Sequence, residues 1–143
     1  MTTDPTMSTP DDQQRDQATV EHNRATVLAF LNLAFNDKKV QEAVTRYVGS
    51  TYIQHNPRIP DGTDGLLAFA SSLQAQFPLA HSDVKRIIAQ GDLVVVHSKV
   101  TYSPDDQGIA AADIFRLEQG KIVEHWDILQ EIPATSMNNN TMF

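Results

Sequence analysis

Residues 110–131, AAADIFRLEQGKIVEHWDILQE, contain the clearest structural signal of this 143-residue chain. Two β-prone runs, 109–118 and 121–131, flank Gln119-Gly120, and glycine supplies the positive φ that a tight hairpin needs. Because alternate residues of a strand point to opposite faces, some of the charged side chains in these runs face away from solvent if either face is covered. The segment therefore predicts an antiparallel hairpin whose charged groups lie either in an apolar cavity or on an ordinary solvent face.

The residues that precede this hairpin predict helices first and strands afterwards. Apolar side chains at three- and four-residue spacing predict helices over about 15–35, 40–48 and 63–77. Thr63 or Asp64 is the expected cap of the third helix, which Pro78 ends. Further strands are expected over 50–56, 81–89 and 93–102. This order predicts an α+β fold in which three helices pack on one face of a curved, mainly antiparallel sheet.

The length of the chain suits a single domain with a real core. We expect a disordered tail over 1–14, one domain over 15–133 and a flexible tail over 134–143. No apolar run approaches the roughly 20 residues of a membrane span, and the first residues do not resemble a secretory signal, so cytoplasmic residence is expected. The net charge of −7, with 11 scattered basic residues, argues against nucleic-acid binding.

Several kinds of chemistry have no sequence signal here. The chain has no cysteine, and its five histidines show no His-x-x-x-His spacing, so no metal site is expected. Its six glycines form neither a phosphate-binding loop nor a Gly-x-Ser-x-Gly elbow. The chemistry that remains is cofactor-free acid–base work by Asp, Glu, His and Tyr side chains.

Asp113 is the best candidate for a general base. It shares its strand face with Phe115 and Leu117, so a covered face would hold the carboxylate against hydrocarbon. Such an environment raises the affinity of a carboxylate for a proton and suits abstraction of a C–H next to a carbonyl. The alternative is a salt-bridged or solvated strand aspartate.

The hairpin register decides which side chains of the last strand face Asp113. His125 and Asp127 have one parity, Glu124 and Trp126 the other, and a bulge at Gln119-Gly120 would exchange the two sets. Trp126 suits either core packing or a platform for substrate. His125 suits either a solvent-facing position or catalysis.

Two other groups of polar residues are candidates. His97 lies in the middle of a predicted strand, where it could donate to a developing enolate or face solvent or a second subunit. A polar cluster precedes the Pro57 loop and could orient a polar substrate, although turn chemistry also explains its last member. This cluster consists of Tyr52, Gln54, His55 and Asn56.

Two segments show a family resemblance. YIQHNP at 52–57, followed by PDG at 60–62, and DIFRLEQGKIVEHWD at 113–127 resemble the SnoaL-like polyketide cyclase group of the NTF2-like superfamily. The similarity covers about 18–133, and the first segment resembles a subset assigned to aldol condensation. The resemblance implies a cone-shaped α+β barrel, with three helices around a strongly bent sheet that encloses one deep pocket. It also implies homodimers that form across the sheet.

The resemblance also implies a chemistry. In the family's cyclases an aspartate acts as acid and base in an intramolecular aldol closure, with a histidine nearby and no cofactor. By position Asp113 is similar to that aspartate and His97 to that histidine, while Asp127 competes for the first role. His55 completes the expected catalytic set. The residues expected to contact substrate are Tyr52, Gln54, Phe115, His125, Trp126 and Asp127.

The leading hypothesis is therefore a cofactor-independent enzyme that acts on an apolar, carbonyl-bearing small molecule. One alternative is a non-catalytic small-molecule-binding module, and another is a helper protein that docks a partner through Lys99 and Thr101 on its sheet. Ketosteroid isomerases and dehydratases share the fold, but the first helix offers Arg24, Thr26 and Asn32 where a second acid would be sought. That departure favours a single-carboxylate mechanism.

Overall fold

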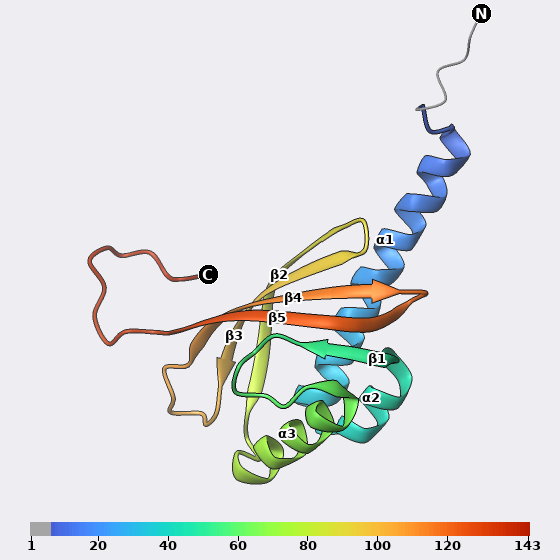
Figure 1. Ribbon diagram of the computed structural model, residues 1–143. Helices are drawn as coiled ribbons and strands as arrows, with labels where there is room; N and C mark the ends of the chain where they lie inside the picture. Colours follow the sequence, from blue (N-terminus) through green and yellow to red (C-terminus); the bar gives the residue numbers. More distant parts are fainter. Residues whose placement is uncertain (1–6) are drawn as a thin grey trace, which may run out of the picture.

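The computed structural model describes residues 7–143 and contains helices packed against a five-stranded sheet (Figure 1). The chain forms α1 (Pro10–Leu31), the π-helix η1 (Asn32–Asn36), α2 (Val40–Tyr47), β1 (Val48–Gln54), α3 (Gly62–Gln76), β2 (His81–Gln90), β3 (Leu93–Thr101), β4 (Ile109–Glu118) and β5 (Lys121–Glu131). The strand order in the sheet is β1-β5-β4-β3-β2. The predicted α+β class, with three α-helices on one side of the sheet, is confirmed.

Strands β2 to β5 form an antiparallel meander, as their order in the sequence predicts. Strand β1 instead pairs parallel to β5 at the edge of the sheet, with Gln54 opposite His125. Sequence reasoning placed no partner beside β1, because the sequence pattern does not say which edge a separate strand joins. This parallel pairing brings the end of β1 next to the hairpin of β4 and β5.

The first helix differs from the prediction at both ends. It begins at Pro10 rather than near Arg15, because Thr9 and Asp12 form a reciprocal capping box around the first turn. The α-helix ends at Leu31, and η1 continues to Asn36. Residues 10–14 of the expected tail are therefore helical, and residues 1–6 of that tail lie outside the described part of the chain.

The third helix has a different cap from the two candidates proposed. Asp61 is its N-cap, and the Asp61 carboxylate accepts the Gly62 N–H at 2.9 Å and the Gln54 N–H at 2.9 Å. One side chain thus caps α3 and fixes the end of β1. Hydrogen bonding from both backbone amides lowers the pKa of Asp61.

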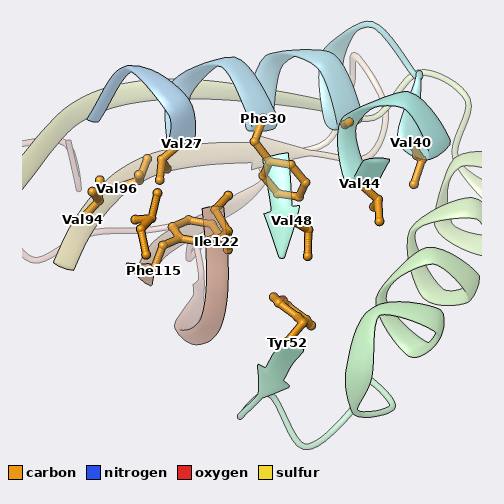
Figure 2. Packing of buried hydrophobic residues seen from close by; sticks show 12 residues of the cluster. Val27, Phe30, Val40, Val44, Val48, Tyr52, Val94, Val96, Phe115 and Ile122 are labelled. Atoms are coloured by element: carbon orange, nitrogen blue, oxygen red, sulfur yellow. The ribbon is translucent and has the colours of Figure 1, made fainter. Parts of the chain in front are cut away.

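The core fills the space between α1, α2 and the concave face of the sheet (Figure 2). Val27 and Phe30 of α1 point towards Val96 of β3 and towards Phe115 and Ile122 of the hairpin. The rings of Phe30 and Phe115 meet edge to face, with centroids 6.3 Å apart. This packing holds the inner face of the hairpin against the helices.

The register of the β4–β5 hairpin settles the parity question. Gln119 (φ 50°) and Gly120 (φ 75°) both adopt positive φ at the turn, which suits a two-residue hairpin loop. The pairing is irregular between Arg116 and Leu117, beyond which Asp113 lies opposite Asp127. The inner face therefore carries Asp113, Phe115, His125 and Asp127, and the outer face carries Arg116, Glu124 and Trp126.

Over residues 7–143, no helix has the length and apolar character that crossing a membrane requires.

Candidate active site

A cavity of about 170 Å³ lies between the helices and the inner face of the sheet. Most of its wall is hydrocarbon, with Phe30, Leu66, Phe69, Leu73 and Phe115 among the contributors. Five polar side chains gather where β1, β4 and β5 meet, and they are Tyr52, Gln54, Asp113, His125 and Asp127, while Lys38 and Gln74 also line the cavity. An apolar cavity of about 150 Å³ can hold benzene, so this space suits one small ring or a short chain.

His125 makes two hydrogen bonds at this wall. Its Nε2 lies 2.8 Å from Oδ1 of Asp113, and its Nδ1 lies 2.9 Å from Oε1 of Gln54. The Gln54 amide has one orientation, because Oε1 also accepts the Asn56 N–H at 3.0 Å. An oxygen acceptor at this position requires a proton on Nδ1.

This geometry leaves one proton to be shared between His125 and Asp113. With Nδ1 already protonated, either Nε2 also carries a proton and faces an ionised carboxylate, or Nε2 is bare and accepts a proton from the neutral acid. Both states keep the pair neutral overall. The two residues thus form a linked acid–base pair whose proton can move along a 2.8 Å contact.

Tyr52 supplies a hydrogen-bond donor at the same wall. Its Oη accepts from Nε2 of Gln54 at 3.0 Å, so the phenolic O–H is directed elsewhere. Burial is the main cause that raises the pKa of Tyr52, and the nearby carboxylates of Asp113 and Asp127 raise it further, against a smaller opposing effect of Gln54. The phenol therefore stays protonated and can donate to a carbonyl oxygen.

Asp127 is a second carboxylate in the same cavity. Both of its oxygens lie 2.9 Å from Nδ2 of Asn56, whose own Oδ1 accepts the Arg58 N–H at 2.9 Å. The second acid that was sought on the first helix comes instead from β5, and Asp127 lines the cavity as the predicted substrate contact requires. Asn56 was considered for this region, but its turn position did not reveal which acid it holds.

The same side chains offer a donor set for a cation. One ligand atom from each of Asp113, His125 and Asp127 lies within 4.8 Å of the others, and two carboxylates with an imidazole suit a divalent metal. A cation bound there would displace the proton shared by His125 and Asp113. The hydrogen bond between these two side chains is the arrangement that the structure records.

Four of the other predicted site residues lie on two different faces of the sheet. Tyr52, Gln54 and Phe115 line the cavity, as the prediction of substrate contact requires. His97 lies on the opposite face of the sheet, between the buried Val96 and Ser98 of the inner face, and its ring stacks on Phe143 with centroids 5.3 Å apart. The prediction that His97 is the partner of Asp113 is therefore wrong, because strand alternation directs the His97 side chain away from the cavity.

His55 and Trp126 also lie outside the cavity. Their rings stack on the outer face with centroids 4.8 Å apart, and Nε2 of His55 lies 2.7 Å from Oε2 of Glu124. Oε1 of Glu124 accepts from Nε of Arg116 at 2.8 Å. The predicted catalytic role of His55 and substrate contact of Trp126 do not fit this placement, because alternation along the chain directs both side chains to the face opposite Gln54 and His125.

Lys38 is a polar residue of the cavity that had no sequence signal. Lys38 lines the cavity from the loop between η1 and α2, although Asn36-Asp37-Lys38 reads only as a helix break. Its φ of 60° is a backbone feature that the sequence pattern does not reveal.

Known proteins give the following matches. The sequence model of the family described as "SnoaL-like domain" matches residues 27–125. No curated protein sequence matched the chain.

Solved structures share the fold. A protein provisionally assigned as a polyketide cyclase from Bacillus cereus ATCC 10987 has a TM-score of 0.65 at 22% identity, covering 88% of this chain and 80% of the other. IdmH from Streptomyces antibioticus, also provisionally assigned as a polyketide cyclase, has a TM-score of 0.60 at 25% identity over 75% and 91% of the two chains. An uncharacterised cystatin-fold protein from Novosphingobium aromaticivorans has a TM-score of 0.66 at 22% identity over 74% and 97%. These neighbours confirm the predicted NTF2-like architecture.

Proposed function

The chain belongs to the SnoaL-like domain family, and we propose that it is a cofactor-independent enzyme for aldol-type cyclisation or a related C–H abstraction. The substrate is an apolar, carbonyl-bearing small molecule that enters the cavity. The observation that carries this proposal is the His125–Asp113 pair at the wall of an apolar cavity. Gln54 fixes the tautomer of the His125 ring in this pair. The acid–base partner of Asp113 is His125, in place of His97 and His55.

Binding places the substrate carbonyl near the polar end of the cavity. The Tyr52 O–H donates to the carbonyl oxygen, and the hydrocarbon wall formed by Phe30, Phe69 and Phe115 packs against the rest of the molecule. A donor already in position when charge develops on oxygen stabilises an enolate without reorganisation. The low-water environment strengthens that interaction.

Proton transfer then starts the reaction. The Asp113 carboxylate, paired with the His125 imidazolium, takes the proton from the carbon next to the carbonyl, and the C–H electron pair passes into the enolate. Asp113 becomes a neutral acid and the enolate oxygen carries the negative charge. Tyr52 and the imidazolium of His125 offset that charge.

Bond formation returns the proton. The enolate carbon attacks a second carbonyl of the same molecule, so one C–C bond forms and the attacked C=O becomes an alkoxide. The alkoxide takes the proton held by Asp113, directly or through His125. The cycle consumes no net proton and needs no redox partner.

The test uses 2,6-heptanedione, a short diketone that can close to a six-membered ring. Wild-type protein should accelerate both deuterium exchange at its α-carbons and ring closure, measured by NMR in D₂O. Asp113→Asn should reduce both rates by about 10³-fold, within the range for loss of a general base. Asp127→Asn should reduce both rates only about tenfold, since Asp127 transfers no proton in the proposed mechanism.

Two outcomes would contradict this assignment. Full activity of Asp113→Asn would remove Asp113 from the mechanism, and a larger loss in Asp127→Asn would make Asp127 the base. Exhaustive treatment with EDTA should leave the wild-type rate unchanged, and a loss restored by a divalent metal would favour the metal-bound use of the same three side chains. No acceleration by the wild-type protein would favour the non-catalytic binding module.

We also propose that two copies pair across the outer face of the sheet. Ile88, Val95, Ile114 and Trp126 lie opposite one another on successive strands and form an apolar row. Ile88 is 62% exposed, and Ile128 in the neighbouring row is 70% exposed. Light scattering should find a dimer that Ile128→Asp dissociates and that Leu79→Asp, at a similarly exposed site outside the sheet, does not. A wild-type monomer at high concentration would contradict the pairing.

A further inference from the structure

Lys38 is the one lysine or arginine among the residues that line the described cavity. It approaches from the loop between η1 and α2, whereas Asp113 and His125 approach from β4 and β5. Its Nζ donates to the carbonyl oxygen of Phe35 at 2.7 Å and to that of Ala80, which immediately precedes β2. Lys38 and the acid–base pair therefore reach the cavity from different parts of the fold, since β3 separates β2 from β4 in the sheet.

The backbone at Lys38 carries two uncommon features. Lys38 adopts φ 60°, one of two positive-φ non-glycine residues found in residues 7–143, and it directly follows a π-helical turn capped by Asp37. Both features cost free energy and are concentrated at functional sites. The Lys38 carbonyl accepts from Nε2 of Gln74 at 2.9 Å, so α3 also holds this loop in position.

The ammonium has partners but no counter-charge. Within residues 7–143 no carboxylate lies within ion-pair distance of Nζ, which instead faces two carbonyls and the Phe35 ring, 5.4 Å from its centroid. An ammonium has three donors, so two carbonyls leave one for another acceptor. Burial lowers the pKa of Lys38 below its usual value.

We propose that Lys38 binds an anionic group, such as a carboxylate, at the end of the substrate remote from Asp113. This inference rests on the proposed function and adds an anionic group to the apolar, carbonyl-bearing body of its substrate, so that the substrate class becomes small organic acids that also carry a carbonyl. A carboxylate would supply the missing counter-charge and accept the remaining N–H. The rest of the substrate, of about one ring, would lie against the apolar wall of the cavity that Lys38 and Asp113 both line.

The simpler reading of Lys38 is structural. Its two hydrogen bonds join η1 to the segment before β2, and a lysine could be kept for that purpose alone. Under that reading the loop would lose stability without Lys38, but no ligand would distinguish a charged from a neutral head group. The experiment is chosen to separate these two roles.

The probes are phenylacetate and phenylacetamide, which have the same shape and differ in charge. Calorimetry should show that wild-type protein binds phenylacetate more tightly. Lys38→Met should weaken phenylacetate binding by about ten- to a hundredfold, the loss expected for one charge-assisted hydrogen bond, and leave phenylacetamide unaffected. Lys39→Met is the matched control, since Lys39 is exposed and adjacent, and it should change neither affinity.

A second variant covers the case in which Lys38→Met does not fold. Lys38→Arg keeps the positive charge and should bind phenylacetate within a few fold of wild type. Comparing its NMR spectrum with that of the wild type also identifies the Lys38 side-chain signals, which are missing from the variant. Phenylacetate should shift these signals in the wild-type protein, and phenylacetamide should leave them unchanged.

Four results would overturn the proposal: equal affinity of wild-type protein for the two probes, no detectable binding of either, an unchanged phenylacetate affinity in Lys38→Met, or the same loss in Lys39→Met. Because the readout is binding, its failure is distinct from failure of the enzymatic proposal. A protein that binds phenylacetate through Lys38 but does not catalyse α-proton exchange would support the proposed ligand class and contradict the proposed reaction. The opposite result would support the reaction and contradict binding of an anionic group by Lys38.

Discussion

The β4–β5 hairpin presents a histidine–carboxylate pair on each of its faces. On the inner face His125 and Asp113 are 2.8 Å apart, with side chains 9% and 18% exposed. On the outer face His55 and Glu124 are 2.7 Å apart, with His55 41% exposed and Glu124 14% exposed. The two pairs contain the same chemical groups at nearly the same distance.

The two histidine–carboxylate pairs differ in their surroundings. Gln54 fixes the inner imidazole, and the inner pair borders a cavity lined mainly by hydrocarbon. The outer pair shares its carboxylate with Arg116 and lies beside the exposed sheet surface. A histidine–carboxylate contact therefore indicates a candidate catalytic pair only when a cavity can bring a reactant to it.

The largest expected difference between the faces is catalytic. His125→Gln should reduce the rate of α-proton exchange in 2,6-heptanedione by about 10²- to 10³-fold, because Asp113 loses its proton partner. His55→Gln makes the same chemical change on the outer face and should alter the rate less than about twofold. Equal losses of rate in the two variants would contradict the proposal that only the inner pair is catalytic.

Burial should produce the next largest difference, and strand β5 offers a matched test of it. Ile122 is fully buried, whereas Ile128 is 70% exposed. Ile122→Ala should lower the free energy of unfolding by about 3 kcal/mol through lost burial and an internal cavity. In the monomer Ile128→Ala loses mainly β-propensity and should cost less than about 1 kcal/mol, and this cost should rise at protein concentrations at which the proposed dimer forms.

Urea denaturation with circular dichroism measures both values. Similar losses for the two substitutions would mean that the outer isoleucine is also buried in solution, as a persistent dimer would require. Repeating the measurement at several protein concentrations separates that case from a misassigned strand face.

Orientation of the inner histidine should have a smaller effect. Gln54→Leu removes the acceptor for Nδ1 of His125 and should reduce kcat by about ten- to a hundredfold, as other groups that orient an imidazole do. Gln54→Glu keeps an oxygen acceptor and should retain more activity than Gln54→Leu. Gln130→Leu, an exposed change on the same hairpin, should have no effect.

Equal activity of the leucine and glutamate variants at position 54 would show that Gln54 acts only by filling space. A loss confined to KM would assign it to substrate binding rather than to positioning of His125.

The smallest effect concerns the outer pair and pH. Hydrogen bonds from His55, and then from Arg116, lower the pKa of Glu124 below its usual 4.5. A depressed folded-state pKa gives stability that is present above about pH 4.5 and is lost as pH falls through the lower value. Glu124→Gln should therefore slightly destabilise the protein at pH 7, and the difference from wild type should disappear in acid.

Thermal unfolding between pH 7 and pH 3 measures this difference. A gap between the variant and wild type that widens as pH falls would reverse the sign and contradict the stated cause.

The fold was largely predictable because its signals are local. The positive φ at Gln119-Gly120 and the apolar spacing of the helices follow from residues close together in the sequence. The predicted family and α+β class are confirmed, and both hairpin strands have the predicted bounds. The parallel partner of β1 and the cap at Asp61 depend on contacts between distant segments, which spacing alone does not encode.

The site was predictable only in part. Asp113 followed from its apolar neighbours on one strand face, and His125 and Asp127 shared a parity, but the irregular pairing at Arg116 decides which parity faces Asp113. His97 was assigned by resemblance, and strand alternation places it on the opposite face. The partnership of Gln54 with His125 required the β1–β5 pairing, so no local pattern revealed it.

The state of the His125 ring is the most direct measure of whether the inner face holds an oriented acid–base pair. In ¹⁵N-histidine-labelled protein, long-range ¹H–¹⁵N spectra report which ring nitrogen carries a proton. Nδ1 of His125 should remain protonated throughout the pH range in which the protein stays folded, and Gln54→Leu should abolish that preference. A wild-type spectrum in which Nδ1 is bare and Nε2 holds the only proton would contradict the pair as described.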